Sequence, residues 1–356
     1  MLDRQDRKLE VDLLKTAGIV AVVVIHSLRD FWNPDFTASE LWIGQMMRFG
    51  VPAFLAVSGF LYAASAGSPA SGSSIGPRLQ RILIPYLVAS CGAIALGLWQ
   101  GQLSAPPGYL VEALIGSTGD PSSSAHTAAN IALDLLLGNA FGPYYYVLVI
   151  TFFVLLSPWM ATLRPRALTA LLVLALALQI VFEGGFWYWN DFFWHVRNPL
   201  LWGGYFVTGW WLRIHSNSIT RAVQQFRGVL VLGAVALVSG CATLLAFEST
   251  GTFPHAVIQL TAWVGVYAIL FLLLIVAWGR NTRSIWLARV SDLTYTIYLF
   301  HLFVLYPLRK SIGGYSEGFD PGILLGIAAA SFALPFFIAL GLRSLFGERT
   351  RTWIGA

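Results

Sequence analysis

Charged side chains are scarce in this chain of 356 residues: they make up 11% of it, whereas 57% of the residues are hydrophobic. A soluble domain usually carries about a quarter charged residues. This composition therefore excludes an ordinary soluble globular protein and indicates a chain that lies in a lipid bilayer. The net charge of +5 does not indicate a nucleic-acid partner, because the basic residues stand in short clusters between apolar runs.

Cysteine is almost missing as well. Cys91 and Cys241 both fall inside apolar runs, which excludes a disulfide framework and predicts two small, buried hydrophobic side chains. No spacing of His, Cys, Asp or Glu suits a metal ion, so we expect no metal. The segment 1–10 is charged and leads into an apolar stretch without a cleavage site, so we expect no secretory signal peptide.

Long apolar runs, by contrast, are abundant. A helix that crosses a bilayer needs about 20 mainly apolar residues, and the longest polar break is a loop at 101–128. The apolar run 131–141 is too short to cross and predicts a re-entrant or interfacial helix. We predict an all-α integral membrane protein with about ten transmembrane helices, forming one domain over residues 1–356. The predicted spans are 11–28, 41–65, 82–100, 142–163, 167–183, 198–214, 228–247, 255–278, 290–308 and 322–345.

The basic residues also predict an orientation, because lysine and arginine favour the cytoplasmic side of a membrane. With a cytoplasmic N-terminus, 17 of the 22 basic residues fall in cytoplasmic segments. The outer side then keeps only Arg29, Arg48, Arg197, Arg309 and Lys310. We therefore expect both termini in the cytoplasm and a multi-pass protein of the cell membrane, the bacterial inner or plasma membrane.

Ionisable side chains at membrane depth are costly and often functional. Lys15 and His26 lie in the first span, 11 residues apart, which places them on nearly one helix face and roughly 16 Å apart along the axis. Neutral imidazole can remove a proton from a hydroxyl near pH 7, so His26 is a candidate base. Each has an ordinary alternative: Lys15 reaching the inner interface, and His26 hydrogen-bonding a neighbouring helix.

Other polar positions form a second set of candidates. Arg78 and Arg81 share a face at the start of the third span, where two guanidiniums suit phosphate oxygens, although lipid headgroups would explain them too. Ser58 precedes Gly59 in the second span and favours either close helix packing or polar contact. Tyr298 and His301 share a face of the ninth span, and Glu183 lies with Asp191 and His195 at the outer end of the fifth and sixth spans. Interhelical hydrogen bonding is the alternative role of Tyr298 and His301.

Four segments, taken together, resemble the acyltransferase-3 family of integral membrane O-acyltransferases over nearly the whole chain. They are a basic residue followed eleven positions later by His (Lys15, His26), VPAFLAVSGFL at 51–61, the Arg78–Arg81 pair, and YTIYLFH at 295–301. Where the family usually has arginine, this chain has Lys15, which lacks the bidentate guanidinium and can change its protonation state. The chain ends soon after the tenth span, so we expect the standalone type without the soluble esterase-like domain.

The resemblance implies a membrane-bound transfer of an acyl group, most simply acetyl, from acetyl-CoA or another acyl-CoA to a hydroxyl of a sugar or surface glycan. It implies that Arg78 and Arg81 hold the CoA phosphates, that Lys15 stabilises charge at the thioester, and that His26 is either the general base or a transient acyl carrier. Ser58, Tyr298, His301 and Glu183 would line the cavity or contact the acceptor. Asp30 would either orient His26 or be an ordinary solvated loop carboxylate. The competing hypothesis is an exporter of a small glycan or lipid-linked sugar, although no pair of related halves is visible.

Overall fold

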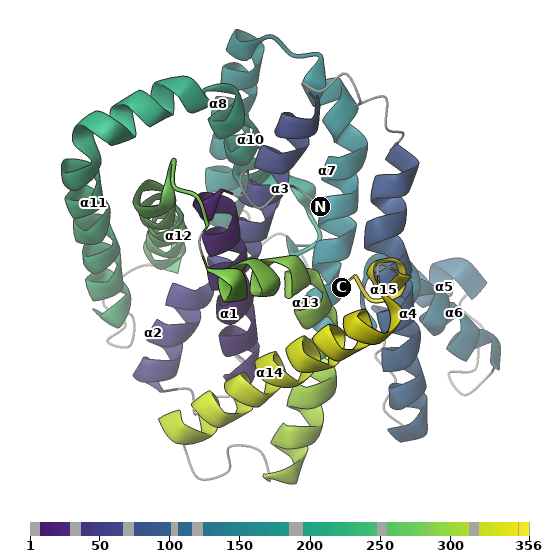
Figure 1. The fold of residues 1–356 in the computed structure, drawn as a ribbon. Helices are drawn as coiled ribbons and strands as arrows, with labels where there is room; N and C mark the ends of the chain where they lie inside the picture. Colours follow the sequence, from purple (N-terminus) through teal and green to yellow (C-terminus); the bar gives the residue numbers. More distant parts are fainter. Residues whose placement is uncertain are drawn as a thin grey trace.

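The computed structural model describes residues 8–28, 37–66, 75–100, 106–115, 124–184, 195–247, 255–282, 284–312, 320–347 and 349–355. Within these ranges the chain forms helices and no named strand (Figure 1), apart from one isolated bridge between Lys8 and Asn281. The prediction of an all-α protein is therefore confirmed. The helices are α1 (Leu9–Ser27), α2 (Ala38–Met47), α3 (Gly50–Ala66), α4 (Ile75–Gln100), α5 (Gly108–Ile115), α6 (Ser124–Leu137), the 3₁₀ turn η2 (Gly142–Tyr144), α7 (Tyr145–Ala161), α8 (Pro165–Gly184), α10 (Pro199–Ile214), α11 (Ser216–Ala246), α12 (His255–Ala277), α13 (Ile285–Ser311), α14 (Pro321–Phe346) and α15 (Arg349–Trp353).

Each predicted span falls on helical residues, but the described residues contain seven helical segments that are long and apolar enough to cross a membrane. Helices α1, α10 and α13 are outside that group. α10 has only 16 residues, and α1 carries Glu10, Asp12 and Lys15 in its first half. The predicted count of ten spans and the location of the two termini stay predictions.

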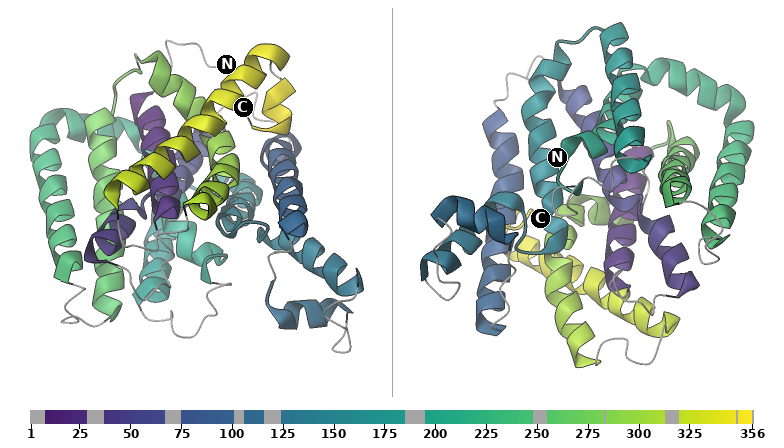
Figure 2. Two further views of the ribbon diagram at one scale, coloured as in Figure 1. Left: turned by 90° about the horizontal axis from the view of Figure 1, so that it is seen from below. Right: turned by 180° about the vertical axis from the view of Figure 1, so that it is seen from behind.

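Helix α1 lies at the centre of the bundle. It contacts α2, α3, α12, α13 and α14, and its buried side chains Ile19, Val22 and Val23 belong to the main hydrophobic core. Figure 1 shows α14 crossing in front of the lower end of α1 and packing beside α13. The two further views show α11 standing beside α12 at one edge of the molecule (Figure 2). A polar side chain on α1 is therefore surrounded by protein.

The predicted second span, 41–65, is two helices rather than one. α2 ends at Met47 and α3 begins at Gly50, with Arg48 as the C-terminal cap of α2. Pro52 is the third residue of α3, where its missing N–H has no helical partner to lose. Arg48 therefore lies at the break between the two helices.

The predicted loop 101–128 contains α5 and the first residues of α6, so that interpretation was wrong. Val111 of α5 packs against Ala129 and Leu133 of α6, which gives this short apolar run a partner. The short helix expected at 131–141 is α6, which ends before Gly138, a residue with a φ of 65°. Cys241 is buried as predicted, whereas Cys91 is exposed, because α4 turns that face away from the bundle.

Candidate active site

His26 and His301 meet at the centre of the bundle. His26 lies in the last turn of α1, and His301 lies in the middle of α13. Their ring centroids are 5.6 Å apart and the rings are tilted by 35°. The sequence predicted each residue as a candidate but did not predict that they touch. Two imidazoles at this distance can act on the same small molecule.

The tautomer of His301 is set by its backbone neighbours. Its Nδ1 lies 3.2 Å from the Ile297 carbonyl oxygen and 2.8 Å from the Tyr298 carbonyl oxygen. A carbonyl only accepts hydrogen bonds, so Nδ1 carries the proton and the neutral ring keeps a lone pair on Nε2. That Nε2 is buried and has no hydrogen-bond partner among the residues that the structure describes. A buried acceptor without a partner is costly unless a ligand or water meets it.

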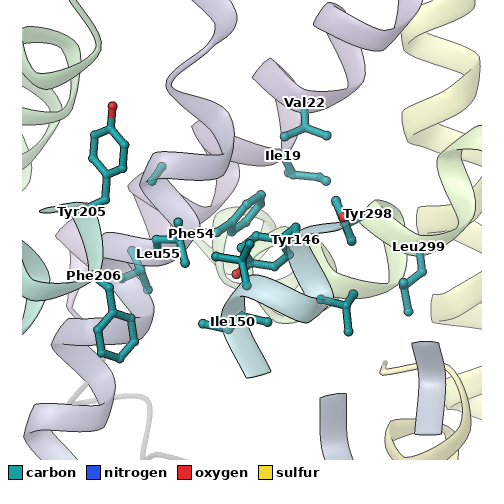
Figure 3. Close-up of a cluster of buried hydrophobic side chains, with 14 of the residues drawn as sticks. Ile19, Val22, Phe54, Leu55, Tyr146, Ile150, Tyr205, Phe206, Tyr298 and Leu299 are labelled. Atoms are coloured by element: carbon teal, nitrogen blue, oxygen red, sulfur yellow. The ribbon is translucent and has the colours of Figure 1, made fainter. Parts of the chain in front are cut away.

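Two tyrosine rings pack in sequence beside the His301 ring. The Tyr298 ring lies 6.3 Å from His301 and 5.4 Å from Tyr146 of α7, and Figure 3 shows Tyr146 and Tyr298 close together below Ile19 of α1. The Tyr298 hydroxyl donates to the Pro143 carbonyl, and the Tyr144 hydroxyl donates to the Leu299 carbonyl at 2.5 Å. These bonds tie α13 to the start of α7 and hold His301 in place. Tyr298 is buried, and its predicted role as a cavity-lining residue stays a prediction.

Ser58 and Gly59 connect α3 to two different neighbours. Ser58 lies within hydrogen-bonding distance of the Tyr146 hydroxyl. A Cβ on Gly59 would lie 2.0 Å from the Phe206 carbonyl oxygen of α10, and one on Gly209 would lie 1.8 Å from the Ala56 carbonyl oxygen. Only glycine permits this approach of the two backbones, so the close packing predicted for Gly59 is confirmed.

Lys15 lies on the same helix as His26, half-buried and nearer the other end. Eleven residues of helix correspond to roughly 16 Å, so Lys15 does not contact the histidine pair. The beginning of α1 is fixed by its neighbours: the Thr282 hydroxyl donates to Asp12 at 2.7 Å, and the Leu9 amide donates to the Arg280 carbonyl at 2.8 Å. The role of Lys15 at the thioester stays a prediction.

Arg78 and Arg81 differ in their surroundings. The half-buried Arg78 donates from Nη2 to the Ser65 hydroxyl at 3.0 Å and lies over the Tyr62 ring, 5.1 Å from its centroid. Arg81 is exposed, one helical turn further along α4. Arg78 is thus held beside the end of α3, while Arg81 is open to a ligand. Two guanidiniums in this arrangement fit a diphosphate.

A second polar group surrounds Arg48. Its Nη1 donates to Gln45 and to Gln259 of α12, both at 3.0 Å, which supplies the partner that a cation at this depth requires. Glu183 and His195 also lie close enough to Arg48 to interact with its charge. Burial lowers the pKa of His195 to about 4, and the Arg48 charge acts in the same direction, so His195 is neutral at pH 7.

The sequence-based candidates did not include Gln45, Gln179 or Gln259, although a glutamine inside an apolar run is a recognisable sign of a polar contact. The Gln179 side-chain oxygen accepts from the Tyr267 hydroxyl at 3.1 Å, and the Gln179 side chain also lies within hydrogen-bonding distance of the Tyr205 hydroxyl. Asp30 and Asp191 lie outside the described residues. In the described ranges, no three His, Cys, Asp or Glu side chains come together to hold a metal ion.

The family comparison decides the class of protein. The acyltransferase-3 model, described as an acyltransferase domain, matches residues 8–342, which is nearly the whole chain. The chain belongs to the acyltransferase-3 family. This match covers α1 with His26, α4 with the arginine pair and α13 with His301. Comparison with curated proteins and with solved structures gave no match.

Proposed function

We propose that this acyltransferase-3 protein moves an acyl group, most simply acetyl, from acyl-CoA to a hydroxyl of a sugar or surface glycan at the bacterial cell membrane. The observation that carries the proposal is the contact between His26 and His301. Two neutral imidazoles inside a membrane bundle supply a proton acceptor where water is scarce, which acyl transfer to an alcohol needs. Family membership supports the acyl donor.

In the direct route, His26 takes the proton of the acceptor hydroxyl while the oxygen attacks the thioester carbon. The C–S bond breaks, and the imidazolium returns the proton to the CoA thiolate. In the covalent route, the neutral His26 nitrogen attacks the thioester carbon first, the C–S bond breaks, and the CoA thiolate leaves with the proton from the other ring nitrogen. The acceptor hydroxyl then attacks the acyl carbon, the C–N bond breaks, and the released imidazole takes the hydroxyl proton. His301 acts from 5.6 Å away in both routes: its Nε2 lone pair accepts a hydrogen bond from His26 or from the acceptor.

The donor would lie between the arginine pair and the histidine pair. Arg78 and Arg81 stand at the start of α4 and would hold the CoA phosphates, with Tyr62 under the Arg78 guanidinium. Lys15, part-way along α1, would stabilise the charge that develops on the thioester oxygen or the leaving thiolate. The acceptor would approach from the side of Arg48, where the Glu183 carboxyl offers hydrogen bonds to hydroxyls.

The test is release of CoA thiol, and incorporation of label from [¹⁴C]acetyl-CoA into glycan, in membranes that contain the protein. His26→Gln should lower turnover by at least about 10²-fold, since glutamine hydrogen-bonds but takes no proton. The matched control is His215→Gln, because His215 stacks on Trp211 at 4.3 Å between α10 and α11, away from the pair. Full turnover by His26→Gln, with acceptor present, would contradict the proposal.

The same assay, run over a range of acyl-CoA concentrations, tests the donor site. Arg78→Ala combined with Arg81→Ala should raise the KM for acyl-CoA by about tenfold to a hundredfold, where each tenfold is about 1.4 kcal/mol. Arg166→Ala, which removes an exposed arginine at the start of α8, should leave that KM unchanged. An unchanged KM in the double variant would indicate that both arginines contact lipid headgroups and do not bind acyl-CoA.

A further inference from the structure

A pocket of about 300 Å³ lies between α11 and the end of α12, apart from the histidine pair. Its α11 wall holds Thr220, Val223, Gln224 and Arg227, and its other wall is the segment 278–280 that leaves α12. The first part of α11 crosses above the end of α12 there (Figure 1). No carboxylate is among these lining residues, so the two guanidiniums of the pocket, Arg227 and Arg280, are not neutralised within its walls.

Arg227 is held rigidly and is incompletely satisfied. Its Nη2 donates to the Trp278 carbonyl oxygen at 2.6 Å, which fixes the guanidinium against the opposite wall. Its Nε is buried and has no hydrogen-bond partner in the described part of the chain. Leaving a buried charged donor unpaired is costly. A planar guanidinium with a fixed orientation and a spare N–H fits an oxyanion with several acceptor oxygens.

More positively charged side chains lie near the pocket wall that contains Trp278. The Trp278 indole packs edge-on against Phe60 with centroids 6.1 Å apart, and it donates to the Thr220 hydroxyl at 2.9 Å. Lys8 and Arg213 stand over the same Phe60 ring, 5.4 and 5.8 Å from its centroid. Arg280 adds an exposed guanidinium at the rim. Four cations thus lie in or near a small cavity, and the Glu10 carboxyl, which bonds to the Gly279 backbone and interacts with Lys8, offsets one of them. The positive charge that remains favours an anionic ligand.

We propose that this pocket binds the phosphate group of an anionic ligand, at a site separate from the donor site at Arg78 and Arg81. Arg227 and Arg280 would contact the phosphate oxygens, and Gln224 would donate a further hydrogen bond. The phosphate belongs either to a membrane lipid headgroup or to a soluble phosphate compound. The pocket wall at Arg280 is bonded to the first residue of α1, so the bound anion would hold in place the helix that carries His26.

The test uses the full-length protein in detergent and two probes. Inorganic pyrophosphate is titrated while thermal unfolding is followed, and phosphatidic acid is compared with diacylglycerol by native mass spectrometry. Arg280→Gln is the main variant, because Arg280 is exposed and its removal does not disturb the core. Arg227→Gln is the second variant. Arg221→Gln is the matched control, since Arg221 is exposed on the same helix and does not line the pocket.

We expect at least one probe to bind, Arg280→Gln and Arg227→Gln each to weaken it about tenfold, and Arg221→Gln to leave it unchanged. Binding of phosphatidic acid alone identifies a lipid headgroup, and binding of pyrophosphate identifies a soluble phosphate compound. The proposal is overturned if neither probe binds, or if Arg221→Gln weakens binding as much as Arg280→Gln. A rise in the KM for acyl-CoA in Arg280→Gln as large as in the Arg78 and Arg81 variant would overturn the separation of the two sites.

Discussion

At the residue scale, the two histidines of the central pair are held differently. The Nδ1–H of His301 is committed to the carbonyls of its own helix, whereas His26 is half-buried near the end of α1. A ring whose orientation is fixed by one nitrogen presents the other nitrogen in a constant direction. Under the proposed function, this difference predicts that His26 transfers the proton or the acyl group and that the Nε2 lone pair of His301 has a positioning role.

His301→Asn tests that division. The asparagine amide can donate to the Ile297 carbonyl as Nδ1 does, but it offers nothing at the position of Nε2. We expect kcat to fall about tenfold to a hundredfold with the thermal unfolding temperature nearly unchanged. His301→Gln places a hydrogen-bonding group near the Nε2 position and should recover part of kcat. If both variants unfold at lower temperature and lose activity in proportion, His301 is only a packing residue.

Asp134 of α6 provides a pH-dependent prediction outside the membrane-spanning helices. Burial raises the pKa of its carboxyl to about 6, although the Asn139 amide and the Arg197 charge oppose the rise. The folded-state pKa exceeds the unfolded-state pKa. The buried carboxyl therefore does not lower the stability of the protein below about pH 4, and it lowers the stability increasingly between about pH 4 and pH 6. Its Oδ2 is buried without a partner within the described ranges, which fits an acid that is best kept neutral.

Asp134→Asn should therefore stabilise the protein at pH 7.5 and have little effect at pH 4. We expect a difference of about 1–2 kcal/mol, seen as a rise of a few degrees in the unfolding temperature that appears only at the higher pH. Glu112→Gln on the exposed face of α5 is the control and should shift the unfolding temperature at neither pH. A pH-independent effect of Asp134→Asn would contradict the assignment.

At the element scale, the packing of α3 on α10 depends on two glycines. Gly59→Ala would place a methyl group 2.0 Å from the Phe206 carbonyl oxygen, and a backbone atom cannot move aside as a side chain can. Overpacking of this kind costs about 1–3 kcal/mol. We expect a lower yield of folded protein and a lower unfolding temperature. Because Ser58 precedes Gly59 and bonds to Tyr146, turnover should fall as well.

Gly228→Ala is the matched control for this substitution. Gly228 lies within α11, and a Cβ there would meet nothing within 4 Å. Alanine favours a helix over glycine by about 1 kcal/mol, so this variant should be slightly stabilised. An equal loss of stability in Gly59→Ala and Gly228→Ala would show that the α3–α10 contact is not what requires glycine.

The helices could be located from the sequence, but several of their ends and contacts could not. Bilayer thickness fixes the length of an apolar run, so all ten predicted spans coincide with helices. The break at Arg48 had a local signal in Gly50 and Pro52, which favour a helix start. α5 had almost none, because Val111 becomes part of a core only through α6. Cys91 shows the remaining difficulty: an apolar run does not reveal which helix face meets the bundle.

The candidate site was partly predictable for a similar reason. His26, Lys15 and Glu183 are conspicuous because ionisable side chains are rare in apolar helices. The contact between His26 and His301 joins α1 to α13, which are far apart in the chain, so only the fold reveals it. The partners of Arg48 were equally hidden, since Gln259 reaches it from α12.

At the scale of the whole molecule, the structure fixes which helix ends lie on one face. Arg280 is bonded to Leu9, and Trp278 is bonded to Thr220 of α11, so the start of α1, the end of α12 and the start of α11 lie together. α13 begins at Ile285 beside them and continues for 27 residues. That length corresponds to about 40 Å, enough to cross a bilayer. If α13 crosses the membrane as predicted, Ser218 and Ser311 should lie on opposite faces of it, whichever face is cytoplasmic.

The distribution of basic residues predicts that the face with Ser218 is cytoplasmic. Ser311 is a strict test of that prediction, because it directly follows Arg309 and Lys310, two basic residues that the prediction places on the outer side. Single cysteines at Ser218 and Ser311, both exposed, are introduced after Cys91 and Cys241 have been replaced by alanine. A membrane-impermeant maleimide added to intact cells should label the cysteine at 311 and leave the one at 218 unlabelled until the membrane is opened. Labelling of 218 alone would reverse the orientation and move Arg78, Arg81 and the phosphate pocket to the outer face, away from cytoplasmic acyl-CoA. Labelling of both from outside would contradict the prediction that α13 crosses the membrane.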